Sequence, residues 1–157
     1  MNFALHVLAL IATLYPLRAD AQERPDPLCP LLQAFVSSVP PDETREFTFH
    51  TIWGANFKDS SESALRATRC VHGEYDPAKA VCVYLVEHGA VEFSGHNAER
   101  ALTCLSPGTH FAKRVDLRQG VFSLNYGTEE RGSNVKILFK EDAQLGGMAL
   151  QIVADGY

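Results

Sequence analysis

Four cysteines, at positions 29, 70, 82 and 104, constrain this chain more than any other feature. In an exported protein, an even set of this kind is typical of two disulfides that hold a small domain together. Cys70 and Cys82 would close a loop of about a dozen residues, contributing roughly 3 kcal/mol in chain entropy. Cys29–Cys104 would then join the first helix to the last. We favour this pairing over the alternative of Cys82–Cys104 with Cys29–Cys70.

The N-terminal segment has the features of a signal peptide, although residues 2–5 carry no lysine or arginine. The stretch "FALHVLALIATLY" is apolar apart from His6 and Thr13, and Ala19 and Ala21 match the small residues of a cleavage site. The apolar core is too short for a comfortable membrane span of about 20 residues. We therefore expect residues 1–21 to be a cleaved signal peptide, with a retained anchor as the alternative. Residues 22–157 should form a single exported domain, periplasmic or secreted.

The charge of the chain excludes several kinds of partner. Its formal net charge is −5, and it has no long basic run. Nucleic acids and anionic membranes are bound by clustered lysine and arginine, so neither is expected as a partner. No second apolar run reaches membrane length, and we expect no membrane association after signal cleavage.

Apolar residues recur at helical spacing in three segments, namely 27–39, 77–88 and 97–105. Asp26 and Asp76 each precede a proline, which predicts a helix cap followed by a proline in the first turn. Gly89 is expected to end the second helix in the left-handed conformation. Asn97 is expected to cap the third helix, with Arg100 pointing outward or pairing with a nearby glutamate.

A weaker signal predicts a fourth helix over residues 60–69. Asp59 followed by Glu62 resembles a capping box, in which the two side chains satisfy backbone N–H groups at a helix start.

Alternation of apolar and polar residues predicts strands over residues 45–53, 121–126, 135–139 and 148–154, and a further strand over residues 111–117. Glycine-bearing connections separate the strands over 121–126, 135–139 and 148–154, which is typical of an antiparallel meander. Because helices and strands are segregated along the chain, we expect an α+β fold. The expected architecture is an antiparallel sheet of four to five strands with three to four short helices on one face, stapled by two disulfides.

The stretch "RCVHGEYDPAKAVC" is a candidate metal site, because Cys70, His72, Cys82 and His88 include thiol and imidazole ligands. The spacing is too wide for the usual zinc pairs, and no C-x-x-C redox motif is present. We therefore expect no metal and no cofactor. His72, Glu74 and Tyr75 should lie on the exposed part of this turn, as contacts for a partner.

Two further groups of residues are functional candidates. Glu87, His88 and His96 carry the groups that general acid–base catalysis uses. The motifs H-E-x-x-H and G-x-S-x-G are absent, which disfavours an enzyme without excluding one. Trp53 and Phe57 flank a glycine and could line a groove, or else belong to core and turn.

These observations favour a small exported, disulfide-stabilised domain that acts by binding a protein. The function that we expect is an inhibitor, or an immunity-type protector against a cell-wall-directed enzyme or toxin. The alternatives are a small hydrolase that uses the Glu87, His88 and His96 cluster, and a small-ligand carrier. A carrier would place Trp53, Phe57 and the inner sheet face around an apolar cavity.

Overall fold

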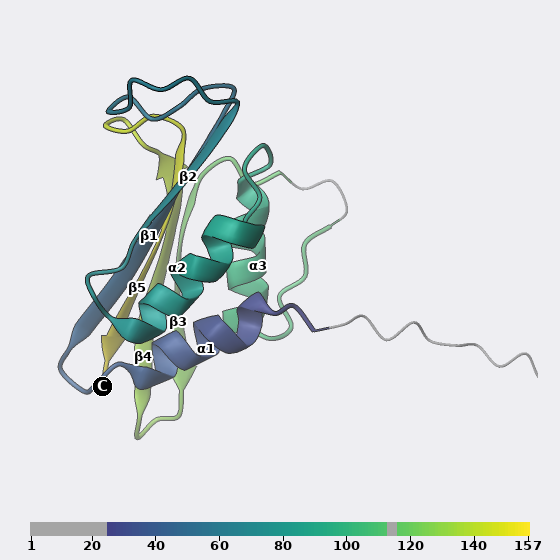
Figure 1. Ribbon diagram of the computed structural model, residues 1–157. Helices are drawn as coiled ribbons and strands as arrows, with labels where there is room; N and C mark the ends of the chain where they lie inside the picture. The colour runs from purple at the N-terminus through teal and green to yellow at the C-terminus, as the bar shows by residue number, and fades with distance from the viewer. Residues whose placement is uncertain (1–24, 113–115) are drawn as a thin grey trace, which may run out of the picture.

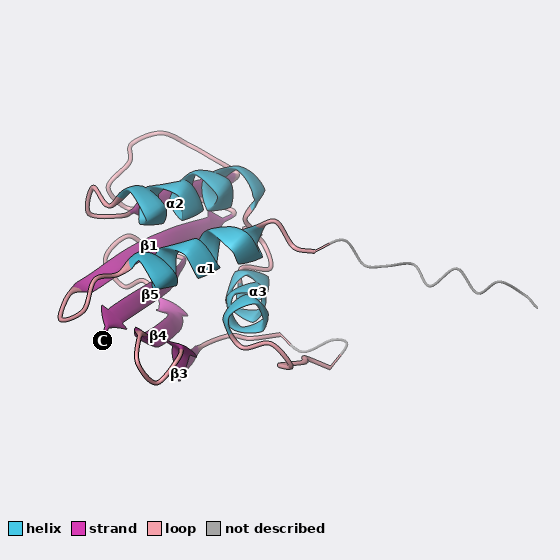
Figure 2. Ribbon diagram, turned by 90° about the horizontal axis from the view of Figure 1, so that it is seen from below, coloured by secondary structure: helices cyan, strands magenta, loops and turns pink. Residues whose placement is uncertain are grey.

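The computed structural model describes residues 25–112 and 116–157, so the signal peptide predicted over residues 1–21 lies outside the described residues. Its elements are α1 (Leu28–Ser38), β1 (Thr44–Trp53), β2 (Arg66–Val71), α2 (Asp76–His88), α3 (Gly95–Leu105), β3 (Gly120–Gly127), β4 (Gly132–Glu141) and β5 (Met148–Gly156). The strands form one antiparallel sheet in the order β2-β1-β5-β4-β3. All three helices lie on one face of this sheet (Figures 1 and 2). The predicted α+β fold, with a C-terminal meander, is confirmed.

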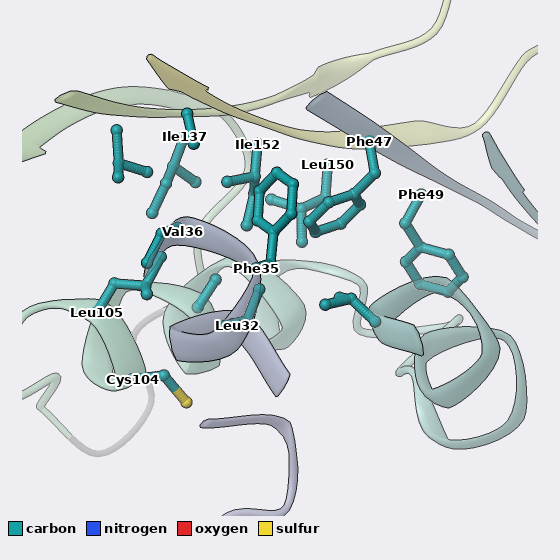
Figure 3. Packing of buried hydrophobic residues seen from close by; sticks show 14 of the residues in the cluster. Leu32, Phe35, Val36, Phe47, Phe49, Cys104, Leu105, Ile137, Leu150 and Ile152 are labelled. Carbon is teal, nitrogen blue, oxygen red and sulfur yellow. The ribbon is translucent and has the colours of Figure 1, made fainter. Parts of the chain in front are cut away.

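The core lies between the inner face of the sheet and the helices (Figure 3). Alternate residues of β1, β4 and β5 point inward and are buried, as expected for strands with only one covered face. Phe35 of α1 meets Phe47 of β1 edge to face, with ring centroids 5.3 Å apart. Burying a side chain of this size contributes roughly 1.5–3 kcal/mol, so these alternating residues hold the two layers together.

Both disulfides connect secondary-structure elements. Cys29–Cys104 joins α1 to α3, and Cys70–Cys82 joins β2 to α2. The favoured pairing is therefore confirmed, and no cysteine is free. Structural disulfides form and persist in an oxidising environment, so the two bridges indicate that this protein folds in an extracellular or periplasmic compartment. No helix in the described parts of the chain is long and apolar enough to cross a membrane.

The fourth helix, predicted over residues 60–69, is wrong. Arg66–Val71 is instead β2, which pairs along β1 from Trp53 back to Thr48. Asp59, the expected cap, forms a bidentate ion pair with Arg69. Long-range strand pairing outweighs a weak local helix signal here, because it satisfies backbone groups of β2 and of β1 at the same time.

The extra strand predicted over residues 111–117 is also not found in the described part of that segment. Residues 111–112 and 116–117 have no strand conformation, and residues 113–115 lie outside the described residues.

Of the N-terminal caps predicted for the three observed helices, two are wrong. Asp26 does accept a hydrogen bond from the Leu28 N–H (2.9 Å) at the start of α1, as expected. Asp76, however, is already within α2 and makes no capping hydrogen bond. Asn97 lies inside α3 and is buried, and its amide bonds both the N–H and the C=O of Ala90. The helix starts two residues earlier than predicted, and Asn97 is a buried crosslink to the preceding loop instead of a surface cap.

The side chain of Arg100 also has a different partner from the expected one. It pairs with Asp26 through two hydrogen bonds of 2.6 and 2.7 Å, and also donates to the Tyr84 hydroxyl. The Arg100 guanidinium lowers the pKa of Asp26 from its ordinary value, because its hydrogen bonds favour the carboxylate over the acid. This ion pair fixes the chain before α1 against α3, beside the Cys29–Cys104 disulfide.

Gly89 follows α2 as predicted, but not in the left-handed conformation. Its φ is −69°, which any residue can adopt. The requirement is space, because a Cβ atom here would lie 2.4 Å from the Leu85 carbonyl oxygen and 2.7 Å from the Phe49 ring. Glycine lets the end of α2 approach the buried phenylalanine of β1.

Replacing Gly89 by alanine should therefore lower the free energy of unfolding by about 1–3 kcal/mol through overpacking. Gly54→Ala is the matched control, since Gly54 has a φ of +79° and no neighbour within 4 Å of an added Cβ. That control should cost only the backbone strain, about 1 kcal/mol. Urea denaturation measures both, and a smaller effect at Gly89 than at Gly54 would contradict the steric explanation.

The two disulfides should differ in their contribution to stability. Cys29 and Cys104 are 75 residues apart, whereas Cys70 and Cys82 are 12 apart. Chain entropy predicts losses of about 4 kcal/mol for Cys29→Ala with Cys104→Ala and about 3 kcal/mol for Cys70→Ala with Cys82→Ala. Denaturant midpoints of the two double variants give the order, and the reverse order would show that native-state strain or packing dominates.

Candidate functional site

The sheet face opposite the helices is open, and none of the described helices covers it (Figure 2). One residue from each strand forms a row across its centre, in the order Val71, Thr48, Gln151, Leu138 and Val121. Val71 and Val121 at its two ends are 54% and 64% exposed. Charged side chains lie on either side of the row. This face therefore offers both apolar and charged contacts.

His50 and Asp142 form the most chemically distinctive pair on this face. His50 Nδ1 lies 2.8 Å from Asp142 Oδ2, and each side chain is only 12% exposed. Asp142 Oδ1 accepts hydrogen bonds from the Gln144 and Leu145 N–H groups, both at 2.9 Å. Its pKa is lowered because the Leu145 N–H favours the carboxylate, with Gln144 and His50 adding to this effect against the desolvation of the group.

A pocket of about 380 Å³ lies beside this pair, with Thr48, Lys140 and Gln151 in its lining. The carboxylate can hold the imidazole with its proton on Nδ1, which leaves Nε2 as a hydrogen-bond acceptor or base. The four cysteines are bridged, so none serves as a nucleophile. In the described residues, no group of three or more His, Cys, Asp or Glu side chains is placed to hold a metal ion. The arrangement suits polar recognition and ties the β4–β5 turn to β1.

Asp142→Asn should weaken the fold near neutral pH, since the amide cannot replace the charged acceptor for His50. Because the pKa of Asp142 is depressed in the folded state, its contribution to stability is present above its ordinary value of 3.8. That contribution is lost as the pH falls through the folded-state pKa. The variant should lose about 1–2 kcal/mol at pH 7 and show a flatter acid limb in urea denaturation. An unchanged acid limb would contradict this assignment.

A second hollow, of about 230 Å³, lies between residues 44–48 of β1 and residues 71–75, which link β2 to α2. We call it the β1 cleft. Two predicted contact residues, His72 and Tyr75, line it. Glu74 lies within the same turn, with an exposed side chain and a φ of 62°. Most of the turn that the sequence singled out is therefore the wall of a surface cleft.

The walls of the β1 cleft are held together by polar and aromatic contacts. The Tyr75 hydroxyl donates to Ser38 Oγ (2.8 Å), and its ring packs against Phe35 in the core. The Arg45 guanidinium lies over the Tyr75 ring at 5.1 Å and pairs with Glu43. These contacts fix Tyr75 in the cleft wall before any ligand arrives.

Two polar atoms around the β1 cleft lack partners. Arg45 Nε and His72 Nδ1 are buried, and neither makes a hydrogen bond to any described residue. A buried polar atom left unpaired costs about 1–3 kcal/mol, which is why such atoms often mark a place where a ligand or water binds. A bound molecule with suitably placed polar groups would remove that cost.

Trp53 and Phe57, the remaining predicted contact residues, differ in how far their side chains are exposed. Trp53 is 47% exposed at the end of β1, whereas Phe57 is 4% exposed, with the Arg69 guanidinium 4.7 Å from its ring centroid. The inner sheet face, which the carrier interpretation needed as a cavity wall, is packed against the helices (Figure 3). Of the two aromatic residues, Trp53 alone offers a surface contact.

The acid–base candidates Glu87, His88 and His96 lie on the solvent-facing sides of α2 and α3. Their side chains are 70%, 49% and 57% exposed. Glu87 and His88 are 3.6 Å apart, while His96 pairs separately with Glu99 at 2.9 Å. A small hollow of about 100 Å³ is lined by Glu87 but by neither histidine. The structure does not gather the three side chains around a common cavity.

Sequence reasoning missed His50, Asp142 and Arg45. His50 and Asp142 are 92 residues apart, and only the register of β1, β5 and β4 brings them together. The alternation in β1 could have placed His50 on its open face, but nothing local points to its partner. Arg45 carried no signal, since a charged residue at a strand start is ordinary.

Comparison of the chain with protein-family models, with curated proteins and with solved structures returned no match.

Proposed function

We propose that the mature chain is an exported binding protein, periplasmic or secreted, that recognises a protein partner through the β1 cleft. The specific role that we propose is an inhibitor, or an immunity-type protector against a cell-wall-directed enzyme or toxin. The observation that carries the proposal is the cleft itself. It is a preformed hollow with unpaired polar atoms at Arg45 and His72, next to the exposed Val71.

Three further features support binding by this surface. Residues that form the cleft wall lie between Cys70 and Cys82, so a disulfide anchors both ends of that segment. An exposed valine beside polar groups is typical of a protein interface, where apolar contacts are surrounded by hydrogen bonds. The net charge of −5 suits a basic partner, because complementary charge raises the rate of association.

The test compares two exposed valines. Val71 borders the β1 cleft and Val83 lies on α2, and the two are 54% and 61% exposed. With the oxidised mature protein immobilised, proteins retained from the native host's periplasmic or secreted fraction are identified and their stoichiometry measured. Val71→Asp should reduce retention of the partner at least tenfold, since it places a desolvated charge in the interface, whereas Val83→Asp should leave it unchanged.

Two outcomes would overturn the proposal. One is that no protein is retained in a stoichiometric amount. The other is that both valine variants reduce retention equally, which would place the contact elsewhere or reveal a general loss of structure. Thermal unfolding of each variant separates the last two cases.

A further inference from the structure

The backbone of β1 directs its polar groups alternately toward β2 and toward β5. Gly54 N–H donates to the Leu65 C=O (2.8 Å), so Gly54 faces the β2 side. Gly156 N–H donates to the Glu43 C=O (2.9 Å), so Glu43 faces the β5 side. Because each residue of an antiparallel strand presents both its N–H and its C=O to one neighbour, the even-numbered residues of β1 all face β2.

This alternation leaves the N–H and C=O groups of two residues of β1 without a strand to pair with. The β2 register ends at the pair Thr48 and Val71. Continuing it would pair Glu46 with Gly73 and Thr44 with Tyr75, but the chain bends away at Gly73 and Glu74, whose φ angles are 55° and 62°. No described residue forms a backbone hydrogen bond with Thr44 or Glu46 on this side.

The N-terminal part of β1 is therefore an unpaired sheet edge, and it lines the β1 cleft. In Figure 1, this part of β1 continues beyond the loop that leads from β2 to α2. Exposed strand edges readily pair with another chain, and proteins usually block them with proline, charged side chains or a covering segment. Neither Thr44 nor Glu46 is a proline, and both side chains are exposed. The one charge on this edge, the Glu46 carboxylate, disfavours an acidic strand but not a basic one.

We propose that an extended, basic segment of the protein partner adds to the sheet as a strand at Thr44 and Glu46, in line with β2. This inference rests on the proposed function and specifies how the cleft is used. Strand addition gains affinity from main-chain hydrogen bonds and specificity from alternate side chains. The added strand would place inward side chains against Arg45 and Tyr75, which line the cleft.

Charge around the edge selects a basic segment. Arg45 is already paired with Glu43, so its charge is matched within the protein. Glu46, which lines the cleft on β1, and Glu74, between the lining residues Gly73 and Tyr75 of the opposite turn, are both exposed. Among the described residues, the Glu46 carboxylate accepts a side-chain hydrogen bond only from Gln151 (2.9 Å), on the open face. Lysine or arginine at alternate positions of the added strand would meet these two carboxylates.

The decisive variant is Glu46→Pro, with Glu46→Ala as its matched control. Both remove the carboxylate, but only proline removes the N–H and fills the space in front of the edge. Proline is tolerated where the missing N–H faces away from the sheet, so the fold should survive. Thermal unfolding checks this. Thr44→Pro provides a second variant, at the next N–H that points to the unpaired edge.

Binding is measured by fluorescence anisotropy with a labelled peptide of alternating lysine and valine. Relative to Glu46→Ala, Glu46→Pro should bind at least about tenfold more weakly, the equivalent of one or two backbone hydrogen bonds and a steric block. A peptide N-methylated at alternate residues along one edge should also lose binding. A glutamate–valine peptide should bind more weakly than the lysine–valine peptide.

The inference is overturned if the lysine–valine peptide does not bind, if proline and alanine at position 46 are equivalent, or if N-methylation has no effect. Concentration-dependent dimerisation that Glu46→Pro abolishes would also overturn it, by assigning the edge to a second copy of this chain. If the natural partner is still retained while Glu46→Pro has no effect on it, the proposed function stands and strand addition fails. If no partner is retained at all, the proposed function fails.

Discussion

The structure depends on the strict alternation of side chains along β1. This strand pairs with both β2 and β5, so its register places every other element of that half of the molecule. Its inward side chains, Phe47 and Phe49, pack against α1 and the end of α2. On its open face, His50 pairs with Asp142. A shift of one residue would exchange the two faces and lose the core and the polar pair together.

Much of the fold could be predicted because its elements carry strong periodic signals. The helix over 77–88 and the strands over 121–126, 135–139 and 148–154 lie within three residues of the observed bounds. The elements that were missed are those that tertiary contacts determine. Arg66–Val71 becomes a strand because β1 offers it a partner. Asn97 becomes a buried crosslink because Ala90 presents both of its backbone groups to the amide.

The candidate site was only partly predictable for the same reason. The turn with His72, Glu74 and Tyr75 is marked in the sequence by a glycine and by two flanking cysteines, so its local geometry was accessible. The other wall of the cleft, residues 44–48 of β1, looked like ordinary strand. Whether an edge is paired depends on where its neighbour ends, and no local pattern in β1 contains that information. His50 and Asp142 are a second case, since their contact exists only through the sheet.

The Cys70–Cys82 disulfide has a consequence beyond stability. Its two cysteines are 12 positions apart, so it closes the turn at positions 72–75 into a small covalent ring. A segment in such a ring samples few conformations before it meets a partner, so little freedom remains to be lost on contact. The bridge restricts this segment during folding, so less conformational entropy is lost on association. Oxidation of the two thiols offsets that entropic cost during folding. The same covalent bond that stabilises the domain thereby pre-organises one wall of the cleft.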